Sequence, residues 1–264
     1  IAMFPEPKAH RAEVSVVPEG DVSFYLLRDS KKVDVVSPKD LVEDDFSHYV
    51  TVGGKRKKTK NAVVYSKHDD KVLGTVCKYG SYKGIAYSAG VNLYQMLVKD
   101  GGPNAPSGMT DRAKRIWASL YHSEGSLDGI NSYDNAFLSM GAIQQTCGTG
   151  TGGGELPAAL NAVKLADAAL YKKLLGDFKI EPVDIGKGLP GNQSGYLSVA
   201  GKAQKTLEEK ESLRKFFLAY RIRDALRDTK FADAFYSYGF KRLDLVDDAA
   251  QEEGTKTYRF RDIY

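Results

Sequence analysis

An abrupt change in hydrophobic periodicity near residue 100 constrains the fold of this chain more than any other feature of its sequence. Before that point, short runs of β-branched and aromatic residues alternate with turn-forming residues such as Gly53 and Gly54, a pattern typical of β-strands. These runs occupy residues 13–17, 22–27, 62–65 and 72–77. Residues 100–108 then concentrate glycine and proline, which interrupt regular structure. The sequence therefore predicts a β-rich region that ends near residue 105.

Helical periodicity dominates after this break. Thr110 and Asp111 form a good helix start, because a hydroxyl at the N-cap and an acid in the first turn both stabilise a helix N-terminus. Apolar residues follow at helical spacing to about residue 123, and residues 155–176 and roughly 205–236 show the same pattern. We therefore expect an α+β protein, with a β-rich region of unknown role at residues 1–105 and a mainly helical domain at residues 106–264.

The composition excludes several classes of protein. Of the 264 residues, 42% are hydrophobic and 27% are charged, as in an ordinary globular protein rather than a disordered one. The 38 Lys and Arg against 34 Asp and Glu leave a net charge of only +4, so no nucleic-acid partner is expected. No apolar stretch approaches the ~18 residues that a membrane span needs. Two cysteines cannot form a disulfide scaffold.

A short basic run at residues 55–60 stands out against this balanced composition. One interpretation is electrostatic capture of an anionic polymer. The other is the solvated tip of a hairpin between two strands, which the sequence favours.

The chain begins at Ile1, with neither an initiator methionine nor the pattern of a signal peptide. We therefore expect a piece of a longer protein. Its export would depend on something outside this segment, or on a route that uses no cleaved signal.

The residues suited to catalysis gather at residues 121–145. Glu124 ends the first predicted helix, and Gly125 follows as a helix-ending residue. A carboxylate is poorly placed at a helix C-terminus, where the dipole favours cations, so its pKa is expected to rise toward that of a general acid. Asp128 and Asp134 follow, and glycoside hydrolysis needs a second carboxylate of this kind. The spacing alone also fits surface acids around a loop, which is the simpler explanation without further motifs.

This segment resembles the active-site segment of the lysozyme-like muramidases, in which a catalytic Glu closes a helix and a β-hairpin follows. Phage-type lysozymes carry an Asp nine positions after this Glu and a Thr fifteen positions after it. Here Asp134 is ten positions after Glu124 and Ser139 is fifteen after, so the hydroxyl position agrees and the acid is one residue late. Gly141 and Gln144 match the Gly-x-x-Gln sequence that lines the glycan groove in goose-type lysozymes and lytic transglycosylases.

A closer similarity is to a group of bacterial and phage peptidoglycan hydrolases, found in endolysins and in cell-wall-degrading effectors of type VI secretion. Their signature combines Asn/Ser-Glu-Gly with Asp-Ala/Gly-Ile/Val-Asn-x-Tyr-Asp, and a Ser-x-Gly-x-x-Gln run and a Gly-Gly-Glu-Leu-Pro run follow it. The resemblance covers about residues 110–160 and implies a lysozyme-like domain with a small β-hairpin at its active site. In this chain the four motifs are residues 123–125, 128–134, 139–144 and 153–157.

The resemblance implies a muramidase that cleaves the β-1,4 bond between N-acetylmuramic acid and N-acetylglucosamine in peptidoglycan glycan strands. The expected setting is a secreted antibacterial effector or an endolysin, acting in the periplasm or cell wall of a target bacterium. An immunity protein or a secretion apparatus would then be a protein partner. No cofactor or metal is expected, because proton transfer and electrostatics carry the reaction.

The resemblance also implies roles for individual residues. Glu124 is the expected general acid, and Asp134, or else Asp128, is the carboxylate that positions water or stabilises the oxocarbenium ion. Ser139 is the third expected catalytic residue, because its hydroxyl can hold the water. The expected contacts with the substrate are Asp128, Asn131, Tyr133 and Gln144.

Several alternatives stay open. Glu124 could act alone, as in lytic transglycosylases, or the groove could bind peptidoglycan without cleaving it. A structural baseplate or spike piece would fit the β-rich half. A thiol hydrolase built on Cys147 and His122 is disfavoured, because His122 precedes the cysteine and lies on a predicted helix. The glycine-rich residues 148–154 lack the Gly-Lys-Ser/Thr ending of a phosphate-binding loop.

Overall fold

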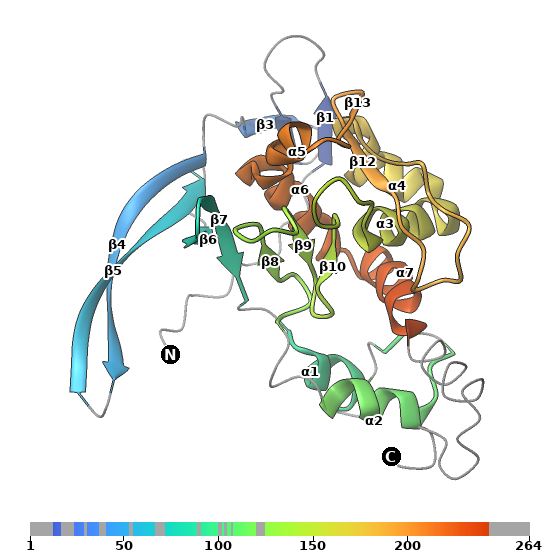
Figure 1. Ribbon diagram of the computed structural model, residues 1–264, viewed down its shortest axis with the longest axis horizontal. Coiled ribbons are helices and arrows are strands. Elements are labelled where there is room, and N and C mark those ends of the chain that lie inside the picture. Colours follow the sequence, from blue (N-terminus) through green and yellow to red (C-terminus); the bar gives the residue numbers. More distant parts are fainter. Residues whose placement is uncertain are drawn as a thin grey trace.

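The structure, a computed structural model, confirms the predicted α+β fold, with antiparallel sheets preceding a helix-rich part (Figure 1). Side chains are described from residue 74 onward. The described residues are 13–16, 24–28, 31–36, 41–52, 55–66, 72–88, 91–99, 102, 105–106, 108–119 and 125–242.

Seven strands form the central antiparallel sheet, in the order β10-β9-β8-β7-β6-β5-β4. Strand β7 precedes residue 105 and strand β8 follows it, and their register pairs Ala86 with Asn131 and Tyr87 with Ile130. The predicted boundary near residue 105 therefore separates two sequence patterns but lies within one sheet. The strands are β4 (Leu41–Val52), β5 (Lys55–Ser66), β6 (Val72–Tyr79), β7 (Tyr82–Tyr87), β8 (Ile130–Asn131), β9 (Ser139–Met140) and β10 (Gln145–Thr146).

A glycine allows the two regions to join in this sheet. A Cβ added to Gly84 would lie 2.1 Å from the carbonyl oxygen of Ser132, so only glycine permits this approach of the two backbones. The Ser132 N–H donates to the Ile85 carbonyl at 2.9 Å, and the Ser132 hydroxyl accepts a hydrogen bond from the Ile85 N–H at 2.9 Å. These contacts attach the segment after β8 to β7.

Two smaller antiparallel sheets accompany the central one, in the orders β1-β2-β3 and β11-β12-β13. The second lies in the region predicted to be mainly helical. Its strands have only two to four residues each, which is too short for the alternation of apolar and polar residues that identifies a strand. The strands are β1 (Glu13–Val16), β2 (Phe24–Arg28), β3 (Lys31–Val36), β11 (Ile180–Val183), β12 (Tyr196–Val199) and β13 (Lys202–Ala203).

Capping side chains mark the start of several helices, although α3 and α6 begin without one. Helix α2 starts at Asp111 as predicted, with the Thr110 hydroxyl accepting a hydrogen bond from the Ala113 N–H at 3.2 Å. The predicted helix at residues 155–176 is divided at Asp167, whose carboxylate caps α4, and Asp228 caps α7 in the same way. The helices are α1 (Leu93–Leu97), α2 (Asp111–Ser119), α3 (Glu155–Ala166), α4 (Ala168–Leu174), η4 (Gly176–Phe178), α5 (Leu207–Lys210), η5 (Glu211–Arg214), α6 (Phe216–Leu226) and α7 (Thr229–Phe240).

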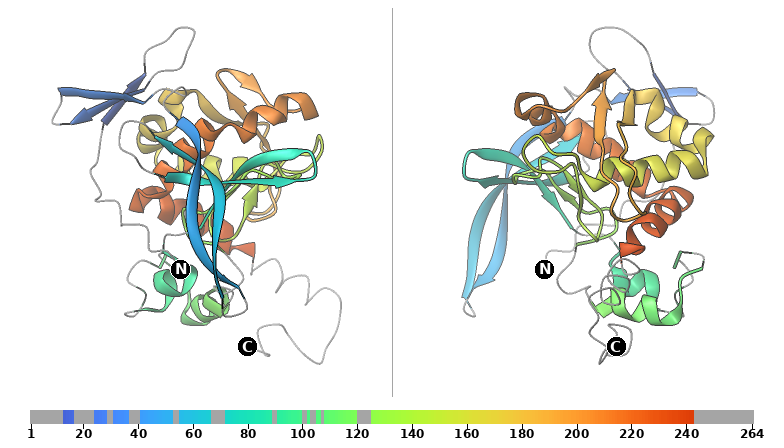
Figure 2. Two further views of the ribbon diagram at one scale, coloured as in Figure 1. Left: turned by 90° about the vertical axis from the view of Figure 1, so that its left-hand side faces the viewer. Right: turned by 45° about the vertical axis from the view of Figure 1, so that its right-hand side comes forward.

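Helix α7 supplies the centre of the core. Helix α3 packs against α7 and β10, and α6 packs against α7 and β9 (Figure 2). Phe231, Phe235 and Tyr236 of α7 are fully buried, and each such side chain contributes about 1.5–3 kcal/mol through burial. Trp117 of α2 packs against Phe240, with ring centroids 5.1 Å apart. In the described part of the chain, none of the helices combines the length and apolarity that crossing a bilayer requires.

Candidate functional site

The candidate site is the segment from Gly125 to Thr146, which contains the short strands β8, β9 and β10 and the turns between them. The antiparallel pair β8–β9 provides the expected small hairpin. Glu124, the expected general acid, and His122 lie outside the described residues. The geometry of the site is therefore described from Gly125 onward.

The segment that follows Glu124 in the chain lies beside Gln144. A Cβ built on Gly125 would be 3.4 Å from the Ser88 hydroxyl oxygen and 3.5 Å from Nε2 of Gln144. The Ser126 N–H donates to the same Ser88 hydroxyl at 3.1 Å, which holds the segment against the end of β7. Two of the four sequence motifs, separated by thirteen residues along the chain, thus meet in space.

Tyr236 of α7 links the segment that follows Gly125 to the turn that carries Gln144. Its hydroxyl donates to the Leu127 carbonyl at 2.6 Å and accepts a hydrogen bond from the Ala142 N–H at 2.9 Å. Gly141 has a φ of 78°, and a Cβ there would lie 2.5 Å from the Tyr236 hydroxyl. Glycine is therefore required at this motif position by both backbone conformation and space. Gln144 ends the turn with a φ of 52°.

A second group of expected site residues lies at the other end of the hairpin. Asn131 of β8 is directly opposite Ser139 of β9, and directly opposite residues in an antiparallel pair have neighbouring side chains. The Asn131 amide donates to Oδ2 of Asp134 at 2.7 Å, and Oδ1 of Asp134 accepts from the Ala136 N–H at 2.8 Å. The hydrogen bonds draw Asn131 and Asp134 together and place Asp134 in the turn that leads to β9.

Tyr133 and Ser139 complete this group. The Tyr133 N–H donates to Oδ1 of Asn131 at 3.2 Å, and the Tyr133 side chain is half-buried. Ser139 is 2% exposed. Each carboxylate oxygen of Asp134 accepts one internal hydrogen bond and retains capacity for another, because a carboxylate offers about four acceptor positions. The Asp134 carboxylate can therefore hold the turn through its two internal hydrogen bonds and, at the same time, accept a hydrogen bond from water.

Asp128 has a different environment, with both carboxylate oxygens engaged inside the protein. Oδ1 accepts from the Ser126 hydroxyl at 3.0 Å, and Oδ2 forms an ion pair with Nε of Arg227 at 2.9 Å. Arg227 also donates to the Tyr87 hydroxyl at 3.3 Å, and the guanidinium of Arg223 lies 4.5 Å from the Tyr87 ring centroid. Burial, together with the charge of Arg227, lowers the pKa of Arg223. Asp128 thus belongs to an internal charge network.

Two buried cations were not predicted from the sequence, and each holds one loop of the site. Lys210 holds the glycine-rich loop that follows β10, and Arg214 holds the loop between β8 and β9. Lys210 is fully buried, and its ammonium donates to the carbonyls of Cys147 at 3.2 Å and Gly148 at 3.3 Å and to that of Gly152. Burial lowers the pKa of Lys210. These carbonyls converge on a cation, so the glycine-rich loop presents acceptors rather than the N–H donors that a phosphate cradle needs.

Arg214, four residues after Lys210, holds the loop between β8 and β9. Its Nη1 donates to the Ser132 carbonyl at 2.9 Å and the Asp134 carbonyl at 2.5 Å. The guanidinium lies 4.4 Å from the Tyr82 ring centroid and 4.7 Å from that of Phe137, which Lys210 also contacts at 5.3 Å. The i, i+4 spacing, with both cations beside the apolar stripe at Leu213, is the sequence signal that could have identified this pair.

The fourth motif, residues 153–157, packs behind the hairpin. Gly154 cannot carry a side chain, because a Cβ would lie 2.2 Å from the Cys147 carbonyl carbon. Glu155 begins α3 and forms an ion pair with Arg242, whose Nη1 donates to the Ile143 carbonyl at 3.0 Å. The motif glutamate is thereby linked to the turn that carries Gln144.

The environment of Cys147 argues against the alternative in which this residue is the nucleophile of a thiol hydrolase. Cys147 is 2% exposed, and burial raises the pKa of its thiol to about 12, although Lys210 acts in the opposite direction. A thiol with this pKa is protonated near neutral pH, whereas the thiolate is the nucleophile. Cys147 is therefore a core residue rather than a nucleophile.

Within the described side chains, no three His, Cys, Asp or Glu residues gather as a metal site. A shallow groove between α3, α4 and α7, lined by Val163, Leu170 and Asp233 among others, contains none of the expected site residues. Comparisons of the chain with models of protein families, with curated proteins and with solved structures give no match.

Proposed function

We propose that this chain is a peptidoglycan hydrolase of the muramidase type, with Glu124 as its general acid. The observation that carries the proposal is the meeting of Gly125 and Gln144, where a Cβ on Gly125 would be 3.5 Å from Nε2 of Gln144. In the sequence Glu124 directly precedes Gly125, so this contact brings the amide of Gln144 close to the chain segment that carries the expected acid. The acid protonates the leaving oxygen, and the amide can bind the N-acetyl group.

The second carboxylate in this proposal is Asp134. Its oxygens keep free acceptor capacity while the Asn131 amide and the Ala136 N–H orient them. Ser139, opposite Asn131 in the hairpin, would help to hold the attacking water. An inverting enzyme has its two carboxyl groups about 6.5–9.5 Å apart to admit this water, against about 5–5.5 Å in a retaining enzyme. A carboxylate across the hairpin suits the wider separation, so the proposed reaction inverts the anomeric centre.

The direct test is the release of soluble muropeptides from purified cell-wall sacculi. Glu124→Gln should keep the fold and lose at least about two orders of magnitude in rate, because general acid catalysis typically contributes ~10²–10⁴-fold. Glu208→Gln removes an exposed carboxylate on α5 and is the matched control. Normal clearing of sacculi by the Glu124→Gln protein would refute the assignment of the general acid.

The same assay separates the two candidate partners of Glu124. Asp134→Asn should lower the rate at saturating substrate, because the lost interaction is made in the transition state. Asp128→Asn should instead lower stability, since it leaves Arg227 without its ion-pair partner. If the folded Asp128→Asn protein is the slower enzyme at saturating substrate, the assignment of Asp134 fails.

Two alternatives give distinct products. A lytic transglycosylase using Glu124 alone releases 1,6-anhydro sugars, whereas a hydrolase releases reducing ends, and mass spectrometry of the muropeptides distinguishes them. A non-catalytic module sediments with sacculi and releases nothing. A baseplate or spike piece does neither.

A further inference from the structure

Strands β4 and β5 continue beyond their pairing with the rest of the central sheet as a two-stranded arm, which we define as residues 45–52 and 55–62. The twelve residues of β4 pair with the twelve of β5, but in the described register β5 pairs with β6 only through Val63, Val64 and Tyr65. Residues 45–52 and 55–62 pair only with each other in the described strands. Figures 1 and 2 show these strands extending away from the helices. Eight residues of strand span about 27 Å.

The arm carries all of the net charge of the protein. It holds five of the 38 Lys and Arg residues and one of the 34 Asp and Glu residues. The other 33 bases and 33 acids balance, so the +4 of the whole chain equals the formal charge of these sixteen residues. If the net charge were spread evenly along the 264 residues, the arm would carry almost none of it.

The register places no acid directly opposite any of these five cations. The residues opposite the five cations are Val52, Thr51, Val50, Tyr49 and Ser47, all uncharged. Consecutive strand positions alternate between the two faces, so Lys55 and Lys57 belong to one face, and Arg56, Lys58 and Lys60 belong to the other. Neighbouring like charges destabilise a pair of strands, and an isolated hairpin is only marginally stable in water. A partner of opposite charge would relieve this repulsion.

We propose that the arm is an electrostatic binding surface for the peptidoglycan network, through the carboxylates of its stem peptides; this rests on the proposed function. The cations lie on strand β5 (Lys55–Ser66), so the basic run is not the solvated hairpin tip that the sequence favoured. The arm extends from β5, which lies three strand spacings, about 14 Å, from β8 where the two strands belong to the same sheet. Peptidoglycan is a network in which stem-peptide carboxylates recur, so one sacculus can contact the cations of the arm while a glycan strand lies at the β8–β9 hairpin.

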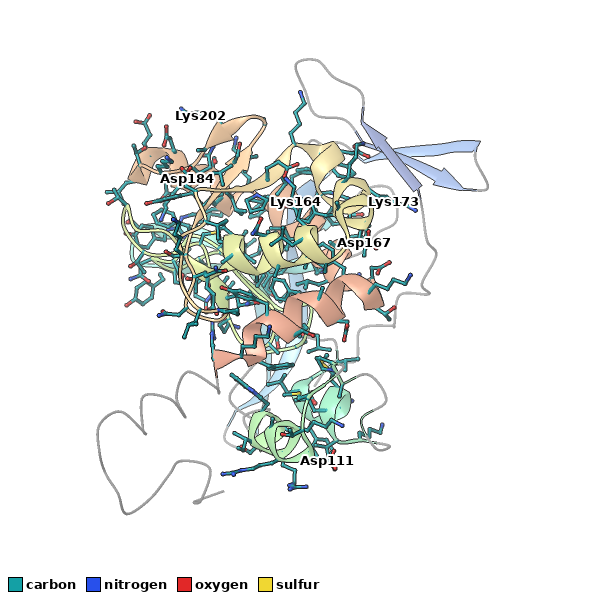
Figure 3. All side chains as sticks on the ribbon, turned by 90° about the vertical axis from the view of Figure 1, so that its right-hand side faces the viewer. Asp111, Lys164, Asp167, Lys173, Asp184 and Lys202 are labelled. Carbon is teal, nitrogen blue, oxygen red and sulfur yellow. The ribbon has the colours of Figure 1, made fainter. Side chains whose placement is uncertain are left out.

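The test measures sedimentation of the full chain with purified sacculi over a range of salt concentrations. The arm variant is Arg56→Ser, Lys57→Ser and Lys58→Ser. The control removes three exposed lysines from the helical body, Lys173→Ser, Lys187→Ser and Lys230→Ser. Figure 3, viewed from the side opposite the arm, shows Lys173 on that body. Circular dichroism verifies that both variants keep the fold.

The arm variant should bind sacculi about tenfold more weakly at low salt, since each exposed ion pair contributes modestly and three are removed. The difference should shrink at physiological salt, where the screening length is about 8 Å. The control should bind like the unaltered protein. Sacculi whose carboxylates have been amidated should bind the unaltered protein and the arm variant equally. Equal binding of the two proteins to untreated sacculi, or an undiminished difference on amidated sacculi, would overturn the proposal.

Two further measurements keep this proposal separate from the proposed function. Binding is read by sedimentation, so a protein that binds through the arm but releases no muropeptides refutes the enzyme and leaves the arm surface standing. A protein that cleaves sacculi and shows no arm dependence refutes only the arm. If the unaltered protein binds a DNA duplex more tightly than sacculi, and the arm variant loses only the DNA, the arm is a nucleic-acid surface and our proposal is wrong.

Discussion

Tyr236→Phe is the perturbation that tests how the site is held together. The hydroxyl donates to the Leu127 carbonyl and accepts from the Ala142 N–H, at 2.6 and 2.9 Å. These two groups belong to the segment after Glu124 and to the turn that carries Gln144. Removing the Tyr236 hydroxyl oxygen therefore breaks both hydrogen bonds through which this side chain joins the two segments.

The expected loss of stability follows from burial. Ala142 is 0% exposed, and its N–H would be left without a partner, whereas Leu127 is a half-buried residue, so losing the hydrogen bond to its carbonyl should cost less. An unpaired buried group costs about 1–3 kcal/mol and the half-buried one less, so the total loss is about 2–4 kcal/mol. For a protein of this size that corresponds to a fall in Tm of roughly 5–15 °C.

Urea unfolding and thermal unfolding, both followed by circular dichroism, measure the loss. Tyr79→Phe makes the same chemical change at a side chain that is 63% exposed and should alter stability by less than about 0.5 kcal/mol. A loss below about 0.5 kcal/mol in Tyr236→Phe would refute the reasoning, because an unpaired buried N–H costs more than that.

A double-mutant cycle sharpens the test. Gly141→Ala should destabilise the protein, because Gly141 has a φ of 78° and its Cβ would lie 2.5 Å from the Tyr236 hydroxyl. In the Tyr236→Phe background that atom is gone, so the cost of Gly141→Ala should fall by more than about 0.5 kcal/mol, as expected for residues in contact. Strictly additive effects would contradict the contact.

The remaining predictions concern single side chains. The N–H groups of Thr206 and Lys205, followed by Lys202, lower the pKa of Glu209 to about 2 from 4.5, so the stabilisation by this carboxylate is complete above about pH 5 and is lost as pH falls toward 2. The difference in unfolding free energy between the unaltered protein and Glu209→Gln should therefore shrink between pH 5 and 3; a constant difference would contradict the cap. In a Cys77→Ser background, which removes the other free and less buried thiol, Cys147 should react with a thiol reagent at pH 8 only after unfolding, given its pKa of about 12; rapid labelling of that folded variant would show that Cys147 is accessible. Lys210→Met should lower stability by about 2–4 kcal/mol in urea unfolding, because three loop carbonyls lose a charged donor; an unchanged midpoint would show that water replaces it.

Short-range features of the sequence determined the outline of the fold. The change in periodicity near residue 100 predicted the α+β fold, and Thr110 with Asp111 predicted the start of α2. These predictions succeed because capping and periodicity depend on residues within a few positions of one another. Asp167 and Asp228 are capping residues of the same kind, and both lie inside segments that the apolar pattern reads as continuous helices. The expected hairpin is formed by β8 and β9, whereas the role of Glu124 remains a prediction.

The support of the site was decided by tertiary structure alone. Tyr236 and Ala142 are 94 positions apart, and Lys210 and Cys147 are 63 apart. A hydrogen bond from a side chain to a distant backbone carbonyl needs only that the fold bring the two together, so it leaves no periodicity or spacing in the sequence. The same holds for Gly84, whose missing side chain lets β7 join the strands beyond residue 105 into one sheet. The sequence specified the residues of the site, and long-range packing specified which of them meet.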